Sequence, residues 1–171
     1  MPLLFLDIDG PLIPFGAGPD ELPEGYPTYG RGVRAGGGHP LLQRVDPALG
    51  GRLAALDCEL VWATTWGEDA NDVLAPWLGL PELPVLPWPE EAYGEQGVHW
   101  KTRPIVEWAA GRPFVWVDDE ITEPDRTWVA AHHPGHALLH RVDARYGLTD
   151  DELDAIRGWL GQRYSSDGSL H

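Results

Sequence analysis

The chain begins with an apolar run that ends in two carboxylates. Residues 3–8 are apolar apart from Asp7, Asp9 follows, and Gly10-Pro11 breaks the run. Such a run is typical of a strand buried on both faces in a parallel sheet, where ligands bind beyond the carboxyl ends of the strands. Side chains two apart in a strand share a face, so the two charges lie close together and need a cation or a shared proton. Because Mg²⁺ prefers oxygen ligands, the run predicts a magnesium site.

Composition narrows the class of protein. The chain has 171 residues, 43% of them hydrophobic and nine of them Trp, which predicts a single domain over residues 1–171 with a sizeable core. Its formal net charge of −15 repels polyanions and disfavours an extended nucleic-acid-binding face. The single Cys58 excludes an internal disulfide, no apolar run is long enough to span a membrane, and no secretory signal is recognisable. We expect a cytoplasmic protein without membrane contact.

Strand patterns alternate with helical patterns along the chain. The predicted strands cover residues 3–8, 59–64, 114–119 and 137–142, with a shorter one around Val85 and Leu86. The predicted helices cover residues 46–56, 68–78, 102–110, 123–131 and 149–160. This order predicts an α/β fold, a three-layer αβα sandwich with a Rossmann-like central parallel sheet of about five strands.

A long loop or flap is predicted at about residues 11–45, where Gly, Pro and Tyr are frequent and no periodicity persists. No insertion is long enough for a separate helical cap domain, so this loop is the candidate lid. Its candidate ligand-contacting residues are Phe15, Tyr26, Tyr29, Arg31 and Arg34.

Three of the predicted strands end in reactive side chains. These are Asp7 and Asp9, then Thr64 and Thr65, then Asp118 and Asp119. The carboxyl ends of parallel strands meet at one sheet edge, so we expect the three groups to converge. The chain has eleven arginines but one lysine, Lys101, just before the helix that leads to the strand of Asp118. A compact ammonium there would offset the carboxylates and meet a phosphate oxygen.

Four features resemble, in chain order, the signatures of the haloacid dehalogenase (HAD) superfamily of phosphohydrolases. They are Asp7-Ile8-Asp9-Gly10, then Thr64, then Lys101, and then Asp118-Asp119. The resemblance implies that Asp7 attacks phosphorus to form an aspartyl-phosphate and that Asp9 protonates the leaving oxygen and later activates water. It also implies that Mg²⁺ is held by Asp7 and Asp9 with Asp118, which Asp119 could replace or assist. Thr64 and Lys101 would hold the phosphoryl oxygens, a role that suits a hydroxyl and an ammonium.

A narrower resemblance lies in residues 61–71 together with Gly79-Leu80-Pro81, which are similar to the HAD domain group of Swiss Army Knife RNA repair proteins. We expect Thr64, Thr65, Trp66 and Lys101 to contact the substrate. The expected partner is a phosphorylated small molecule or the terminal phosphate of a nucleic acid, the latter presented by another protein because the chain is acidic.

Other classes of function stay open at this point. A catalytically silent phosphate- or protein-binding domain of the same architecture is the main alternative, although such a domain would be expected to lack at least one of the reactive residues. A phosphotransferase or a dehalogenase with the same aspartyl chemistry is a third. The motifs do not specify the substrate, the lid mechanism or the oligomeric state.

Overall fold

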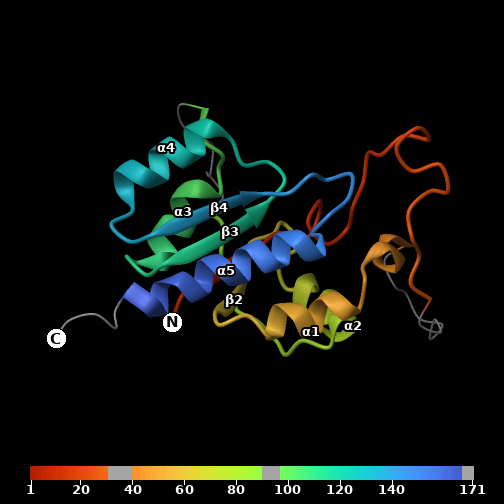
Figure 1. Cartoon of the computed structure of the whole chain (residues 1–171), viewed down its shortest axis with the longest axis horizontal. Coiled ribbons are helices and arrows are strands. Elements are labelled where there is room, and N and C mark those ends of the chain that lie inside the picture. The colour runs from red at the N-terminus through yellow and green to blue at the C-terminus, as the bar shows by residue number, and fades with distance from the viewer. Residues whose placement is uncertain (31–39, 90–96, 167–171) are drawn as a thin grey trace.

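The centre of the protein is a sheet of four parallel strands (Figure 1). The computed structural model describes residues 1–30, 40–89 and 97–166. The strands are β1 (Leu3–Leu6), β2 (Glu59–Trp62), β3 (Phe114–Asp118) and β4 (Ala137–Arg141), in the spatial order β2-β1-β3-β4. β1 is therefore flanked on both sides, and its Leu6 pairs with Trp62 of β2 and Val117 of β3.

Helices cover both faces of this sheet, as the predicted three-layer arrangement requires. The helices are η1 (Pro40–Arg44), α1 (Ala48–Ala54), η2 (Ala70–Leu74), α2 (Ala75–Leu78), α3 (Thr102–Ala109), α4 (Glu123–His132) and α5 (Asp150–Ser166). α1, α2 and α5 lie on one face, and α3 and α4 lie on the other (Figure 1).

The alternation of side chains along β1 divides the core in two. Leu4 and Leu6 pack on one side with Ile156 of α5, whereas Leu3 and Phe5 pack on the other with the α3 and α4 side chains. All four β1 side chains are 0% exposed. Burial on both faces explains why the strand is uniformly apolar.

The predicted fifth strand around Val85 and Leu86 is not confirmed in the described residues. Val85 forms only an isolated parallel bridge with Trp62. The N–H of Trp62 donates to the carbonyl of Pro84, and the carbonyl of Trp62 accepts from the N–H of Leu86. Pro84 carries no N–H, so it cannot donate to the carbonyl of Leu60, and the ladder cannot extend toward the start of β2. About five strands were expected, whereas the described residues form a sheet of four strands with one bridged residue, Val85, at its β2 edge.

The helix predicted over residues 68–78 is divided. A π-helical segment, η2, precedes the short α2, and Pro76 stands at the start of α2. Because Pro76 has no N–H, it cannot donate the α-helical hydrogen bond to the residue four positions earlier. The helix then ends at Gly79, whose φ of 69° is left-handed.

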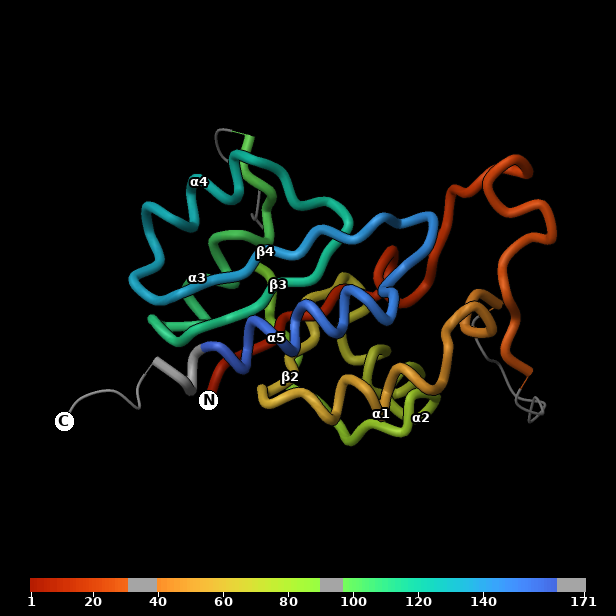
Figure 2. Tube along the Cα trace, in the orientation of Figure 1, coloured from red at the N-terminus to blue at the C-terminus, as the bar shows by residue number. Residues whose placement is uncertain are grey.

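The predicted long loop is irregular from Pro11 to Gly30, and η1 forms its far end. It runs beside the connection between β4 and α5 (Figure 2), where Phe15 N donates to Ala144 O at 2.8 Å. Arg31 and Arg34, two of its candidate ligand contacts, lie outside the described residues.

No helix of the described residues has the length and hydropathy needed to cross a bilayer. The cytoplasmic location stays a prediction.

Candidate active site

The carboxyl ends of β1 and β3 bring three carboxylates together. β1 and β3 are neighbours, and Asp7 N donates to Val117 O at 3.1 Å just beyond the paired residues. One oxygen from each of Asp7, Asp118 and Asp119 lies within 4.8 Å of the other two. The convergence expected from two separate strand ends is present for these residues.

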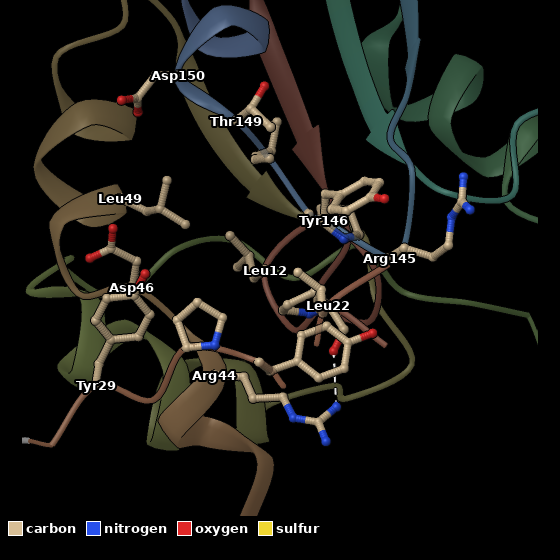
Figure 3. A pocket seen from close by; sticks show the side chains of 16 residues that line it. Leu12, Leu22, Tyr29, Arg44, Asp46, Leu49, Arg145, Tyr146, Thr149 and Asp150 are labelled. Carbon is tan, nitrogen blue, oxygen red and sulfur yellow. Dashed lines mark hydrogen bonds between the residues drawn. The ribbon is translucent and has the colours of Figure 1, made fainter. Parts of the chain in front are cut away.

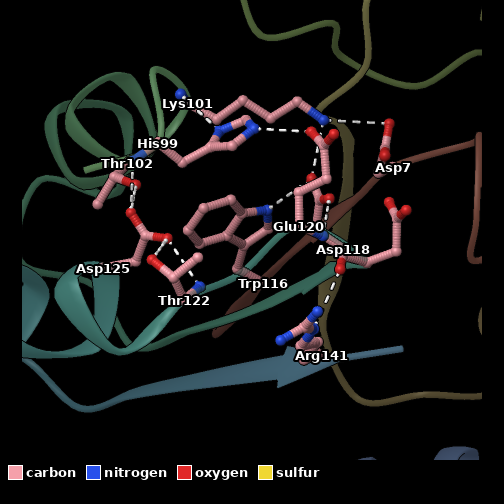
Figure 4. A network of polar contacts seen from close by, with 11 residues as sticks. Asp7, His99, Lys101, Thr102, Trp116, Asp118, Glu120, Thr122, Asp125 and Arg141 are labelled. Atoms are coloured by element: carbon pink, nitrogen blue, oxygen red, sulfur yellow. Dashed lines mark hydrogen bonds and ion pairs between the residues drawn. The ribbon is translucent and has the colours of Figure 1, made fainter. Parts of the chain in front are cut away.

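Lys101 lies between two of these carboxylates. Its Nζ is 3.1 Å from Asp7 Oδ1 and 2.8 Å from Asp118 Oδ2 (Figure 4). The residue is only 3% exposed, and burial acts against its charge, but the two carboxylates outweigh burial and raise its pKa. Lys101 is therefore protonated, and so a cation, at neutral pH.

One ammonium does not neutralise three carboxylates. Burial raises the pKa of Asp7 to about 7, with Lys101 opposing and Asp118 adding to the shift. Burial and the neighbouring Asp118 also raise the pKa of Asp119 to about 6. A cluster of oxygen donors whose charges repel one another is suited to a hard divalent cation such as Mg²⁺. Asp7, Asp118 and Asp119 therefore fit the metal that the sequence predicts.

A tight turn carries Asp9 past this cluster. Leu12 N and Ile13 N both donate to Ile8 O at 3.0 Å, so the chain leaves the β1 ladder earlier than predicted. Gly10 in this turn has a φ of 104°, and a Cβ there would lie 2.6 Å from Asp119 Cγ. Only glycine lets the turn approach Asp119 this closely.

The Asp9 side chain is exposed and lies outside the three-carboxylate cluster. Its Oδ2 accepts a hydrogen bond of 3.1 Å from the indole N–H of Trp66. The predicted role of Asp9 as a metal ligand gains no support from this side-chain position. An accessible carboxylate held by an indole N–H suits proton transfer to a leaving group.

Thr64 and Thr65 differ in their surroundings. Thr64 is fully buried, and its Oγ1 accepts from Trp66 N at 3.2 Å. Its carbonyl accepts from the indole N–H of Trp88 at 3.0 Å. Thr65 is exposed. Thr64 is thus held at the end of β2, whereas the predicted substrate contact of Thr65 stays a prediction.

Sequence reasoning missed the residues that hold Lys101 in place. The buried Asp125 carboxylate accepts four hydrogen bonds, from His99 N (2.7 Å) and Thr102 Oγ1 (2.8 Å), and from the N–H and hydroxyl of Thr122 (both 2.8 Å). Burial acts to raise the pKa of Asp125, but these bonds outweigh it and lower the pKa. Asp125 therefore joins the start of α4 to the segment that carries Lys101 (Figure 4).

The His99 ring holds the Lys101 backbone directly. Lys101 N donates to His99 Nδ1 at 3.1 Å, so Nδ1 is an acceptor, and Nε2 lies 2.9 Å from Glu120 Oε2. Trp116 is fully buried in the core and also donates its indole N–H to Asp118 Oδ2 at 3.3 Å. The Thr122-x-x-Asp125 spacing is a readable capping-box signal, but nothing in it indicates the bonds to His99 and Thr102.

Among the comparisons with known proteins, one family model matches this chain. The model of the family described as the HAD domain in Swiss Army Knife RNA repair proteins matches residues 3–153. That range includes every predicted site residue. No curated protein and no solved structure matches the chain.

Proposed function

Because the chain belongs to the family of HAD domains in Swiss Army Knife RNA repair proteins, we propose that it is a magnesium-dependent phosphohydrolase that cleaves a phosphomonoester through an aspartyl-phosphate. The observation that carries this proposal is the buried Lys101 ammonium bonded to both Asp7 and Asp118, with Asp119 beside them. A site with these charges has little structural value, because buried charges that are only partly compensated destabilise a fold.

Asp7, Asp118 and Asp119 would hold the metal. Bound Mg²⁺ supplies positive charge that lets an anionic carboxylate approach an anionic phosphate. Lys101 adds a second positive charge from the protein itself, at a position fixed by its bonds to Asp7 and Asp118.

Asp7 acts as the nucleophile in this proposal. One of its oxygens bonds to phosphorus while the bond from phosphorus to the leaving oxygen breaks, and Asp9 gives that oxygen a proton. Asp9, now ionised, takes a proton from a water molecule whose oxygen attacks the same phosphorus. Inorganic phosphate leaves, and Asp7 is a free carboxylate again.

Thr64 and Lys101 are the proposed contacts of the phosphoryl oxygens. The Thr64 hydroxyl uses its oxygen to accept from Trp66 N, so its proton can be donated to a phosphate. Donors placed in advance at a position where charge develops stabilise the transition state without further rearrangement.

The proposed substrates are a phosphorylated small molecule and the terminal phosphate of a nucleic acid. The net charge of −15 opposes long contacts with a polyanion but does not prevent access of one terminal phosphate to the carboxyl end of the sheet. A nucleic-acid end would then depend on a partner or a linked domain to hold the rest of the strand.

Phosphate release from a panel of compounds tests this function. The panel contains sugar phosphates, nucleotides and oligonucleotides with a 3′- or 5′-phosphate, each assayed with Mg²⁺ and with EDTA. We expect release that EDTA stops and that Asp7→Asn abolishes. Silence of the wild type across the panel, or full activity of Asp7→Asn, would contradict the proposal, and silence would favour a phosphate-binding domain.

A further inference from the structure

The base of the 11–30 segment encloses a cavity of about 250 Å³ (Figure 3). Neither the three clustered carboxylates nor Lys101 lines it, but Tyr26 and Tyr29, two of the candidate ligand contacts of the predicted lid, do. Leu12 and Leu49 are among its apolar lining side chains. The cavity lies just below the range of about 300–1,000 Å³ typical of ligand pockets, so it suits one small ring system. Its walls come from residues 11–14, 22–29, 44–49 and 145–150.

Contacts within the protein fix these walls. Tyr29 N donates to Gln43 O at 2.8 Å, which ties the 22–29 wall to η1. Arg145 pairs with Glu21, which ties the loop to the connection that precedes α5. A ligand would therefore enter a preformed site and would not have to order the loop.

Arg44 is the most distinctive group in the cavity. Its guanidinium carbon lies 4.3 Å from the centroid of the Tyr26 ring, and its NH1 donates to Pro14 O at 3.1 Å. Within the described residues, no carboxylate forms an ion pair with it. A planar guanidinium stacked on one ring can stack a second flat ring on its other face, and its remaining N–H groups can bind an anion.

Of the other charged groups that line the cavity, Arg145 and Asp150 are held in ion pairs. Arg145 is held by two carboxylates, those of Asp143 and Glu21. Asp150 pairs with Arg52, and Asp46 accepts a hydrogen bond of 2.9 Å from Ala48 N. Within the described residues, Arg44 is thus the lining cation that no carboxylate pairs with, whereas the Asp46 carboxylate is held by that one backbone hydrogen bond.

The cavity lies against the turn that carries Asp9. Leu12 belongs to this turn and lines the cavity, while Gly10 in the same turn contacts Asp119. Gly147 packs against the opposite part of the turn, because a Cβ there would lie 3.0 Å from Pro11 O. The turn therefore separates the cavity from the carboxylate cluster, and the two are distinct sites.

We propose that this cavity binds a flat aromatic ring that carries an anionic group. The ring stacks on the Arg44 guanidinium beside Tyr26, and the anion accepts hydrogen bonds from the guanidinium. A nucleoside monophosphate and the terminal nucleotide of an oligonucleotide share this chemistry. The site does not depend on the catalytic function proposed above.

Calorimetric titration of the full chain in EDTA tests the proposal. Without metal the carboxylate cluster repels phosphate, so binding in EDTA reports on another site. We expect AMP to bind, and ribose 5-phosphate and adenosine to bind at least about tenfold more weakly, because each lacks one of the two recognised groups. A 5′-phosphorylated dinucleotide that binds more tightly than AMP would identify a nucleic-acid end as the ligand, and equal or weaker binding would identify a mononucleotide.

Two variants of Arg44 locate the binding. Arg44→Met should weaken AMP binding at least about tenfold, because it removes a charge-assisted contact. Arg44→Lys keeps the charge but not the flat surface, so it should retain ribose 5-phosphate binding and lose the preference for AMP. The matched control is Arg157→Gln, which removes an exposed arginine of α5 paired only with Asp154 in the described residues and should leave AMP binding unchanged. Unaltered AMP binding by Arg44→Met, equal binding of AMP and ribose 5-phosphate by the wild type, or no AMP binding at all would overturn the proposal.

Discussion

Replacement of the nucleophile by its neutral isostere should stabilise the metal-free protein. Asp7 is 7% exposed, and burial raises its pKa from the ordinary 3.8 to about 7. Between these two pH values the folded chain binds more protons at Asp7 than the unfolded chain does. The free energy of unfolding therefore falls as pH rises from about 4 to about 7.

The magnitude follows from the same two pKa values. At about 1.4 kcal/mol for each pKa unit, ionised Asp7 costs about 4 kcal/mol of folding stability above pH 7 and less than about 1 kcal/mol at pH 4. Asp7→Asn removes this cost because its side chain cannot ionise. We expect the variant to exceed the wild type in stability by about 4 kcal/mol at pH 8 and by under about 1 kcal/mol at pH 4.

Urea unfolding in EDTA, followed by Trp fluorescence, measures this difference at a series of pH values. Asp119 titrates in both proteins with a pKa that is also raised, so its contribution cancels in the comparison. The control is Asp20→Asn, an exposed aspartate in the 11–30 segment, which should change stability little at any pH. A difference between wild type and Asp7→Asn that does not grow with pH, or a less stable variant at pH 8, would refute the reasoning.

Three further substitutions test the groups around the nucleophile. In release assays, Lys101→Met should lower phosphate release at least about a hundredfold, and undiminished release would exclude the role assigned to Lys101. In urea unfolding, the same substitution should destabilise the metal-free protein more at pH 8 than at pH 5. Trp66→Phe removes the hydrogen-bond donor to Asp9. Turnover should therefore fall for alkyl phosphates, whose leaving oxygen needs a proton, but not for nitrophenyl phosphate. An equal loss with both substrates would point to a structural effect. The side chain of Asp125→Asn cannot accept all four hydrogen bonds, so the free energy of unfolding measured in urea should fall by about 2–4 kcal/mol. Unchanged stability would contradict the role of Asp125.

The sequence predicted the convergence of those candidate residues whose positions follow from strand ends. Asp7 and Asp118 converge because β1 and β3 pair in register, and register follows from two uniformly buried apolar strands. Lys101 was singled out by composition, as the one lysine of the chain, and in the structure it forms ion pairs with Asp7 and Asp118.

The parts that could not be predicted depend on contacts between distant segments. The four bonds to Asp125 need the residues before α3 and the start of α4 to lie side by side, which no local pattern reports. The direction of the Asp9 side chain depends on Trp66, more than fifty positions further along the chain. The expected short strand around Val85 and Leu86 is not confirmed beyond one bridged residue, because Pro84 has no N–H with which to continue the ladder beside β2.

The most direct test of the proposed mechanism is to trap the aspartyl-phosphate. The full chain is incubated with Mg²⁺ and acetyl phosphate and treated with borohydride, which reduces an aspartyl-phosphate to homoserine, and its peptides are mapped by mass spectrometry. We predict homoserine at position 7, and none there in EDTA or in Asp7→Asn. Homoserine at Asp9 or Asp118, or phosphate release without any homoserine at Asp7, would contradict the assignment of Asp7 as the nucleophile.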